Sequence, residues 1–243
     1  KYIRDIEPGE ILVANGNMLK SYRILPKRRH AFCIFEFIYF SRPDSMIYRM
    51  NVDKVRRRLG RQLASEHPVE ADIVMAVPDS SNTAALGFSE ATGIPFEIGL
   101  IRNHYVGRTF IEPEQKIRDL DVKIKFNPIR GVLKKKRVVI VDDSIVRGTT
   151  SRKLVKMLRE AGAKEVHMRV SSPQITHPCF YGIDMPTKKE LIASRRSVKS
   201  IRRYLGVDSL GYLSLGGMLS LAALPKEGFC HACFSGKYPI KVK

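Results

Sequence analysis

One stretch constrains the fold of this 243-residue chain more than any other: residues 138–151, which read VVIVDDSIVRGTTS. Four apolar residues suited to a buried strand run into two adjacent aspartates, and a loop of small, hydroxylated residues with one glycine follows. Adjacent carboxylates repel each other and are costly to remove from water unless a cation or a polyhydroxylated ligand compensates them. The stretch therefore predicts a buried strand that delivers two carboxylates to a binding loop.

Apolar periodicity predicts two strand–helix–strand units along the chain. The strands are expected at residues 73–77, 95–100, 137–141 and 165–171, and the connecting helices at residues 81–92 and 150–161. A further helix is expected at residues 53–66. Two such units favour an α/β fold with a largely parallel sheet, whose binding loops lie at the carboxyl ends of the strands.

The two ends of the chain differ from this pattern. Residues 1–25 read as short strands with a hairpin-type turn at Asn15-Gly16, and the basic residues 26–30 follow. Beyond Pro173, helices are expected at residues 188–194, 197–205 and 215–224, before a tail that carries two cysteines. We therefore predict an N-terminal hairpin and a cysteine-bearing C-terminal tail around the α/β domain.

The net charge favours an anionic partner. Lys and Arg number 43 against 24 Asp and Glu, which gives a formal net charge of +19. Such a surface attracts nucleic acid, acidic membranes or a phosphorylated small substrate, and charge alone does not choose among them. Part of the charge is expected on solvated helical faces, as at Arg56, Arg57, Arg58 and Arg61, or as an adaptation to heat. No apolar run is long enough to span a bilayer and no signal-peptide core follows the basic N-terminus, so a cytoplasmic protein is expected.

The loop after the two aspartates suits a phosphorylated sugar. Its amides and the hydroxyls of Ser144, Thr149 and Thr150 suit a phosphate monoester beside the positive end of a helix. The two carboxylates suit vicinal hydroxyls and a divalent cation. The plainer alternative is that Asp142 and Asp143 merely end a strand and cap a helix. A nucleotide P-loop is excluded, because no G-x-x-x-x-G-K-[ST] is present.

These residues carry a resemblance to a known family. VVIVDDSIVRGTTS resembles the phosphoribosyl pyrophosphate (PRPP) loop of the type I phosphoribosyltransferases. Five further segments resemble the amidophosphoribosyltransferase family and occur in the same order. They are FEFIYFSRPDS, VPDSSNTAALGF, NHYVGRTFI, REAGAKEVH and YGIDMPTKKELIA. The likeness covers nearly the whole chain and implies the type I phosphoribosyltransferase fold, a parallel sheet flanked by helices.

The resemblance assigns roles to individual residues. Asp142 and Asp143 would bind the ribose hydroxyls and orient Mg2+, with Ser81 close to the magnesium pyrophosphate. The implied PRPP-binding set is Asp142, Asp143, Ser144, Ile145, Val146, Arg147, Gly148, Thr149 and Thr150. The implied catalytic residues are Arg102, His104 and Arg108, on a loop that would close over the leaving group and exclude water.

Each of these assignments has a plainer alternative. Ser81 read alone is an equally good helix N-cap. The segment NHYVGRTFI read alone is an ordinary solvated basic loop. His104 also departs from the family pattern, in which arginine is commoner at this position.

The four cysteines raise a separate question. Cys230 and Cys233 have the two-residue spacing that lets two thiolates reach one metal, whereas Cys33 and Cys179 lie far away in sequence. Spacing alone is equally compatible with a metal site and with ordinary buried thiols, and zinc suits the same ligands. The resemblance implies a [4Fe-4S] cluster, because the iron–sulfur subclass of the family has cysteines in similar contexts. All four would ligate this cluster.

The resemblance also implies an activity, domains and partners. Ammonia would be transferred to C1 of PRPP with loss of pyrophosphate, forming 5-phosphoribosylamine at the first step of de novo purine synthesis. Residues 1–25 would be closing strands of a glutaminase domain, and residues 26–243 the phosphoribosyltransferase domain. The N-terminal cysteine nucleophile of that glutaminase is absent from the sequence, so we expect a fragment, a separate glutaminase chain or use of free ammonia. Dimers or tetramers, inhibition by purine nucleotides and no membrane partner are also expected.

Two alternatives belong to other functional classes. A PRPP-binding regulator of the same fold would use the basic surface to hold DNA. Against this reading, the sequence has no helix-turn-helix pattern before the domain and does have the basic lid segment. A salvage transferase would use a purine base as the nucleophile, and it would not need the four cysteines.

Overall fold

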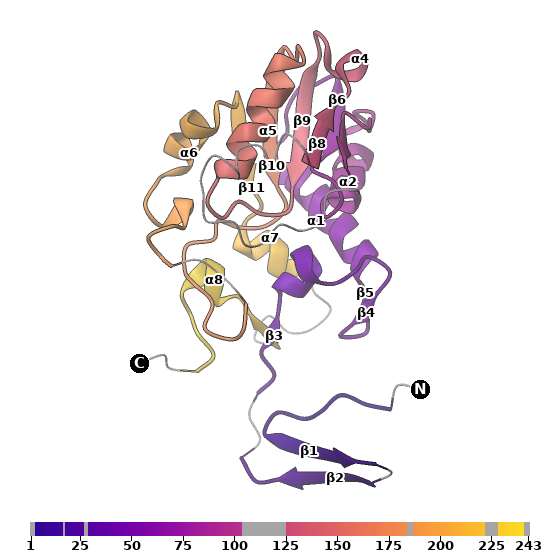
Figure 1. Cartoon of the computed structure of the whole chain (residues 1–243), viewed down its shortest axis with the longest axis vertical. Helices are drawn as coiled ribbons and strands as arrows, with labels where there is room; N and C mark the ends of the chain where they lie inside the picture. Colours follow the sequence, from indigo (N-terminus) through magenta and orange to yellow (C-terminus); the bar gives the residue numbers. More distant parts are fainter. Residues whose placement is uncertain are drawn as a thin grey trace.

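One four-stranded parallel sheet organises the fold, which we describe from a computed structural model (Figure 1). The structure describes residues 3–16, 18–26, 29–103, 125–183, 187–221 and 228–240. The strands are β6 (Ile73–Ala76), β9 (Arg137–Asp142), β10 (Glu165–Val170) and β11 (Ser209–Tyr212), in the order β11-β10-β9-β6. All three neighbouring pairs are parallel, which confirms the predicted α/β fold.

Helices cover both faces of this sheet. They are α1 (Val52–Glu66), α2 (Asn82–Thr92), α5 (Thr149–Glu160) and α6 (Val198–Leu205). Val139 and Val141 of β9 belong to the apolar cluster of α1 and α2, whereas Val138 and Ile140 belong to that of α5 and α6. Because both faces are buried, the strand is apolar at successive positions rather than at alternate ones.

Glycines bring α1 and α2 into close contact. A Cβ on Gly60 would lie 1.9 Å from the carbonyl oxygen of Ala84, and a Cβ on Gly87 would lie 2.1 Å from that of Arg57. A larger residue at either position would force the helices apart. Since α2 follows β6 after a short turn, this contact helps to fix the turn at residues 77–81 at the carboxyl edge of the sheet.

The remaining elements are short. They are β3 (Phe32–Cys33), a π-helix (Glu36–Phe40), β4 (Met46–Ile47), β5 (Met50–Asn51), β7 (Leu100–Arg102), β8 (Phe126–Pro128), α4 (Arg130–Leu133), a 3-10 helix (Ile192–Ser194), α7 (Leu215–Ser220), β12 (Phe229–Cys230) and α8 (Ala232–Ser235). α7 is shorter than the helix expected at residues 215–224, of which residues 222–224 lie outside the described part.

Two predicted elements were wrong. Residues 95–100 do not form a strand of the main sheet: a single parallel bridge joins Phe96 to Val74, and β7 pairs antiparallel with β8 instead. Pro95 has no amide to donate and Gly99 lies tightly against Met75, which limits regular pairing here. The helix expected at residues 188–194 is a turn followed by the 3-10 helix.

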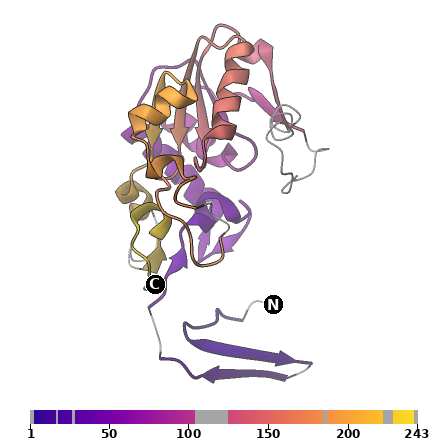
Figure 2. The same ribbon diagram turned by 60° about the vertical axis from the view of Figure 1, so that its left-hand side comes forward.

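The predicted hairpin is present and lies apart from the sheet. β1 (Glu10–Asn15) pairs antiparallel with β2 (Met18–Arg23), and Gly16 adopts a φ of +54° between them. Figures 1 and 2 both show this hairpin below the rest of the molecule. Ile11, Val13 and Leu19 of the hairpin are exposed. Its apolar side chains are therefore left uncovered.

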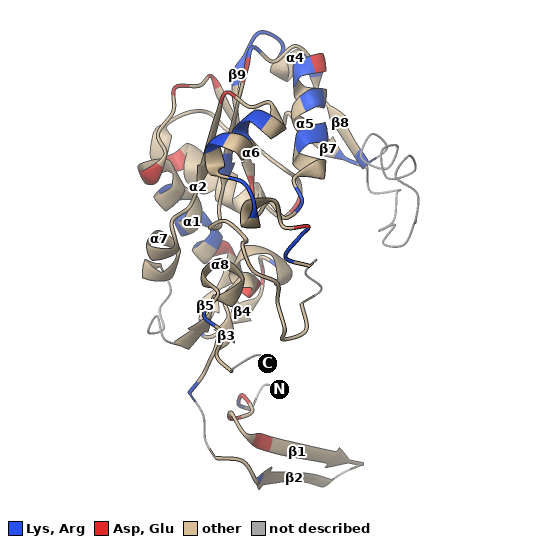
Figure 3. Ribbon diagram, turned by 90° about the vertical axis from the view of Figure 1, so that its left-hand side faces the viewer, with Lys and Arg blue, Asp and Glu red and all other residues tan. Residues whose placement is uncertain are grey.

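The positive charge is distributed over several elements, with lysines and arginines along the exposed sides of α5 and α6 (Figure 3). Arg58 and Arg61 of α1 are exposed, as expected, and Arg57 is half-buried. Arg56 is only 2% exposed, which corrects its assignment to a solvated face. In the described part of the chain, no helix is both long and apolar enough to cross a membrane.

Candidate functional site

The carboxyl edge of the sheet holds a hollow of about 810 Å³, which we call the acidic-pair hollow. Of the predicted site residues it is lined by Arg102, Asp143, Ser144, Val146 and Arg147. The turn after β6 and the π-helix line the other sides. The structure therefore brings Arg102, which was predicted to lie on a lid, together with the second aspartate and part of the loop around one space.

The acidic pair itself is buried. Asp142 and Asp143 are 8% and 7% exposed. Asp143 accepts hydrogen bonds from the hydroxyls of Ser80 and Ser144, both at 2.7 Å, and Asp142 accepts one from the Asp143 amide at 3.0 Å. Burial raises the pKa of both carboxyls, and for Asp142 the charge of Asp143 raises it further. A cation or a hydroxyl ligand bound at the pair would favour the ionised form of these carboxyls.

A buried arginine lies beside the pair and was missed in the sequence. Arg56 donates to the carbonyl oxygens of Phe37 at 2.7 Å and Ser41 at 2.8 Å. Its charge acts to lower the pKa of Asp143, against the stronger effect of burial. Its burial could have been predicted from its position, four residues after Val52 and three before Leu59. This spacing places Arg56 on the apolar stripe of α1.

The two serines of the turn after β6 have different surroundings. Ser80, which the sequence reasoning missed, donates to Asp143 and lines the hollow. Ser81 precedes α2 but makes no side-chain cap bond, and it is fully buried. Its Oγ lies close enough to Asp142 to affect the pKa of that carboxyl, although the geometry of a hydrogen bond is not met. Ser81 thus occupies the N-cap position of α2, as the plainer alternative predicts, but its hydroxyl does not cap the helix.

The loop between β9 and α5 has the geometry of an anion cradle. Within the described part of the chain, the amides of residues 144–147 donate to no acceptor. Gly148 has a φ of +76°, and a Cβ there would lie 2.8 Å from Ile192. Ile145 is buried, and Arg147 pairs with Glu190 at 3.0 Å. Unpaired amides before a helix N-terminus are suited to a phosphate.

The predicted lid is described only at its start. Arg102, on β7, pairs with Asp79 at 3.1 Å at the rim of the hollow. Both side chains are partly exposed, so this pair contributes little to stability. His104 and Arg108 lie outside the described residues.

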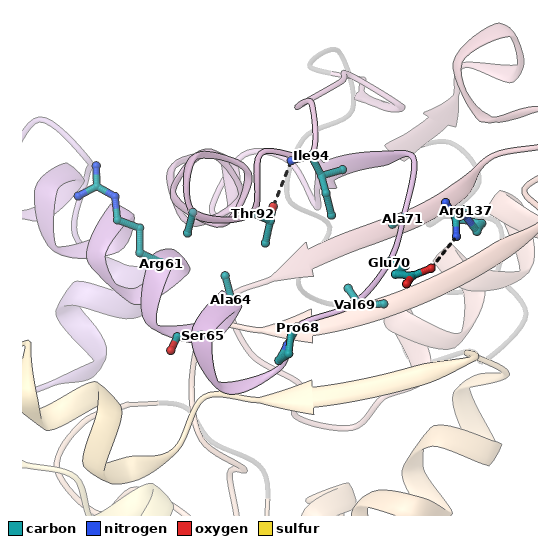
Figure 4. A pocket seen from close by; sticks show the side chains of 11 residues that line it. Arg61, Ala64, Ser65, Pro68, Val69, Glu70, Ala71, Thr92, Ile94 and Arg137 are labelled. Carbon is teal, nitrogen blue, oxygen red and sulfur yellow. Dashed lines mark hydrogen bonds and ion pairs between the residues drawn. The ribbon is translucent and has the colours of Figure 1, made fainter.

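A second hollow, of about 710 Å³, lies at the amino edge of the sheet, between the ends of α1 and α2 and the start of β6 (Figure 4). We call it the amino-edge hollow. Arg137 pairs there with Asp72 at 3.0 Å and Glu70 at 3.5 Å, and Arg61 pairs with Glu90 at 2.7 Å. The arginines of this hollow already have carboxylate partners. They are therefore less available to bind an anion than the size of the hollow suggests.

The fold gathers the four cysteines in one region. Cys33 of β3 and Cys230 of β12 are register partners, and Cys233 lies on α8. The Cys233 carbonyl accepts hydrogen bonds from the amides of Thr176 and His177, close in sequence to Cys179. Figure 1 shows α8 and β3 side by side below the sheet. The tail is thereby joined to the segments around Cys33 and Cys179.

The thiols affect one another electrostatically. Burial raises the pKa of Cys33 to about 11, and the charges of Cys230 and Cys179 add to this shift. Burial also raises the pKa of Cys233, helped by the other three cysteines. Four sulfur donors in one neighbourhood have the chemistry that an iron–sulfur cluster requires. As placed, however, no three His, Cys, Asp or Glu side chains of the described residues converge as a metal-binding group.

Comparison with known proteins shows which proteins this chain is similar to. No family model matches the chain. It is 55% identical to amidophosphoribosyltransferase of Bacillus subtilis, covering 99% of this chain and 52% of that protein, and 52% identical to that of Methanocaldococcus jannaschii, covering 100% and 54%. The chain is thus similar over nearly its whole length to part of these amidophosphoribosyltransferases. It spans about half the length of these curated relatives.

Solved structures show the same similarity. The structure of an allosteric regulatory enzyme of purine biosynthesis matches with a TM-score of 0.89 and 54% identity, over 100% of this chain and 53% of that one. Glutamine PRPP amidotransferase from B. subtilis, complexed with ADP and GMP, matches with a TM-score of 0.88 and 54% identity, over 100% and 54%. The chain therefore shares the phosphoribosyltransferase-type fold that its sequence predicts.

Proposed function

We propose that this chain forms the PRPP-binding, phosphoribosyltransferase part of an amidophosphoribosyltransferase. It would transfer ammonia to C1 of PRPP with loss of pyrophosphate, forming 5-phosphoribosylamine at the first step of purine synthesis. The observation that carries this proposal is the buried pair Asp142–Asp143 beside a loop whose amides have no acceptor in the described part of the chain. The relatives named above support it.

The roles proposed for the residues follow from their placement. Asp142 and Asp143 hold the ribose hydroxyls, while the loop from Ser144 to Thr150 receives the 5'-phosphate. Arg102 lies at the rim, where its charge would act on the departing pyrophosphate. His104 and Arg108 are proposed to close over the same group.

The carboxylates also fit a magnesium ion. Mg2+ is usually held by one or two carboxylates together with substrate phosphates, and Asp142 and Asp143 supply such oxygen donors. When bound, Mg2+ would neutralise charge on the pyrophosphate. Ser81 has a buried hydroxyl beside Asp142 that suits the edge of this site. The chain's own residues would then orient the sugar and exclude water from its anomeric carbon.

We further propose that Cys33, Cys179, Cys230 and Cys233 hold a [4Fe-4S] cluster. The gathering of four partly buried thiols around the tail supports this assignment. A cluster would relieve the mutual repulsion of four thiolates and tie the tail to the rest of the chain. Protein purified without oxygen should be brown, and Cys233→Ser should abolish the colour. A colourless protein that binds one zinc ion would overturn the cluster.

The proposal extends to the nitrogen source and partners. Residues 1–25 would belong to a glutaminase-type domain and residues 26–243 to the transferase domain, with ammonia supplied by that domain or by a separate chain. Inhibition by purine nucleotides is proposed because one relative is described in complex with ADP and GMP. A dimer or tetramer remains a prediction. A cytoplasmic location also remains a prediction, since some relatives are described as chloroplastic.

Pyrophosphate release from Mg-PRPP tests the proposed reaction. The chain is assayed without oxygen, with ammonium at alkaline pH, with glutamine and with neither. Release with ammonium that the variant Asp142→Asn plus Asp143→Asn loses is the expected result. Binding of Mg-PRPP without release in the presence of any nitrogen source would contradict the transferase and favour a PRPP-binding regulator, for which a salt-dependent DNA shift would be the next observation.

A further inference from the structure

Two buried hydroxyl groups at the carboxyl edge of the sheet have no hydrogen-bond partner in the described part of the chain. They are Ser81 Oγ and Tyr212 OH. Ser81 is fully buried and Tyr212 is 8% exposed. Buried polar groups in folded proteins are nearly always hydrogen-bonded, and one left without a partner costs stability. The positions of these two hydroxyls therefore need an explanation.

The register of the sheet places Tyr212 on the same row and face as Asp142. Tyr212 of β11 is opposite Val170 of β10, and Val170 is opposite Asp142 of β9. Directly paired residues of neighbouring strands project from the same face. Their Cα atoms are separated by two strand spacings, roughly 10 Å. The residue between them is the short side chain of Val170, and a tyrosine is long enough to reach over it.

The electrostatics agree with this placement. Burial raises the pKa of Tyr212, and the negative charge of Asp142 raises it further. The two groups therefore lie within electrostatic reach of each other. The raised pKa also keeps the phenol protonated, so it remains a hydrogen-bond donor.

Asp142 has accepting capacity to spare. Its carboxylate receives one hydrogen bond within the described residues, from the Asp143 amide at 3.0 Å. An ionised carboxylate has two oxygens and about four acceptor sites. Asp143, by contrast, already receives two serine hydroxyls. Asp142 therefore has room for the phenol of Tyr212 as well as for the nearby hydroxyl of Ser81.

We propose that Tyr212 is a positioning residue of the PRPP site: its hydroxyl donates to the Asp142 carboxylate when that carboxylate engages Mg-PRPP. The inference rests on the proposed function, which supplies the ligand. Without ligand the hydroxyl has no partner among the described residues, and a buried hydroxyl left without a partner lowers stability. On binding, the new hydrogen bond fixes the orientation of Asp142 toward the sugar.

A hydroxyl that only fills space would give the opposite signature. Tyr212 belongs to the apolar cluster that includes Ile145, Val170 and Ile192, where a phenylalanine would pack equally well. Removing a buried hydroxyl that has no partner is neutral or stabilising for the free protein. The variant Tyr212→Phe should therefore separate stability from ligand affinity.

The test measures thermal unfolding of the free chain and calorimetric binding of Mg-PRPP for three proteins. These are the wild type, Tyr212→Phe and the control Tyr22→Phe, whose hydroxyl lies on the exposed strand β2. We expect Tyr212→Phe to unfold at the same or a higher temperature than the wild type and to bind Mg-PRPP about tenfold more weakly, in line with the loss of one hydrogen bond to a charged group. Tyr22→Phe should change neither quantity.

Each other outcome has a defined meaning. Unchanged affinity of Tyr212→Phe would overturn the positioning role and leave the proposed function intact. A lower unfolding temperature would show that the hydroxyl is already bonded in the free chain, which also overturns the inference. A wild-type chain that does not bind Mg-PRPP at all would overturn the proposed function, and with it this role of Tyr212.

Discussion

The two hollows at opposite edges of the sheet differ in how their polar groups are satisfied. At the amino edge, Arg137 and Arg61 each have a carboxylate partner. At the carboxyl edge, two buried carboxylates adjoin each other and a loop offers amides that have no acceptor among the described residues. The volumes are similar, about 710 and 810 Å³. Unsatisfied charge and hydrogen-bonding capacity, rather than size, distinguishes the candidate binding site.

The largest effect is expected from Asp142→Asn combined with Asp143→Asn. Mg-PRPP binding and pyrophosphate release should fall at least about 100-fold, because the sugar and cation lose their charged ligands. The free variant should nevertheless unfold at a higher temperature than the wild type at pH 8.

The pH dependence of that difference is also predicted. The folded-state pKa values of both carboxyls are raised above the ordinary 3.8, so their contribution to stability is fully present below that value and is lost as pH rises through the folded pKa values. The stability gained by the variant should therefore shrink between pH 8 and pH 4. A variant that is less stable than the wild type at pH 8 would contradict the repulsion argued for the pair.

The next largest effect is expected on stability, from Arg56→Met. The carbonyl oxygens of Phe37 and Ser41 would lose their buried donor, and Asp143 would lose a nearby positive charge. The free energy of unfolding should fall by about 3 kcal/mol, measured by urea unfolding. Arg58→Met, on the exposed side of the same helix, should change it by less than about 0.5 kcal/mol. Equal losses in the two variants would contradict a special role for Arg56.

A smaller effect is expected from Gly148→Ala in the loop. The position has a φ of +76°, and the added Cβ would meet Ile192 at 2.8 Å. The free energy of unfolding should fall by about 1–2 kcal/mol, and Mg-PRPP should bind more weakly because the amides are displaced. Gly206→Ala is a matched control, with a φ of +75° and no neighbour within 4 Å of the added Cβ. The control should lose stability and keep its affinity.

The smallest effect is expected at the amino edge, from Asp72→Asn. The carboxylate accepts from the Arg137 amide at 2.7 Å and pairs with its side chain. Loss of this partly exposed pair should lower the free energy of unfolding by about 1 kcal/mol or less. The pKa of Asp72 is lowered by these hydrogen bonds, so its contribution is present above the ordinary 3.8 and disappears as pH falls below it. Weaker Mg-PRPP binding by this variant would erase the distinction between the hollows.

The sequence predicted those parts that depend on local pattern. α1, α5, β9 and β10 lie within one residue of their expected ends, because continuous apolar runs and one-sided stripes specify them. The loop after Asp143 could be located for the same reason. Residues 95–100 could not be assigned correctly, since their pairing depends on Pro95 and on contacts of Gly99 made only in the folded chain.

Parts of the candidate site needed the structure. Ser80 reaches Asp143 from the turn after β6, and the register places Tyr212 in the same row as Asp142. Only the strand order β11-β10-β9-β6 brings these segments, far apart in sequence, to one edge. Arg56 was predicted to be exposed like the neighbouring arginines, because its charge was given more weight than its position on the apolar stripe of α1. The Mg2+ site, the iron–sulfur cluster and the lid were assigned from the family resemblance, and these assignments remain predictions.

Hydrogen–deuterium exchange of the chain with and without Mg-PRPP tests the central claim most directly, because it reports on both hollows in one experiment. The claim predicts slower exchange of the amides of residues 143–150, with no change at residues 64–71 and 91–94 of the amino-edge hollow. Slower exchange at the amino edge without protection of residues 143–150 would contradict it.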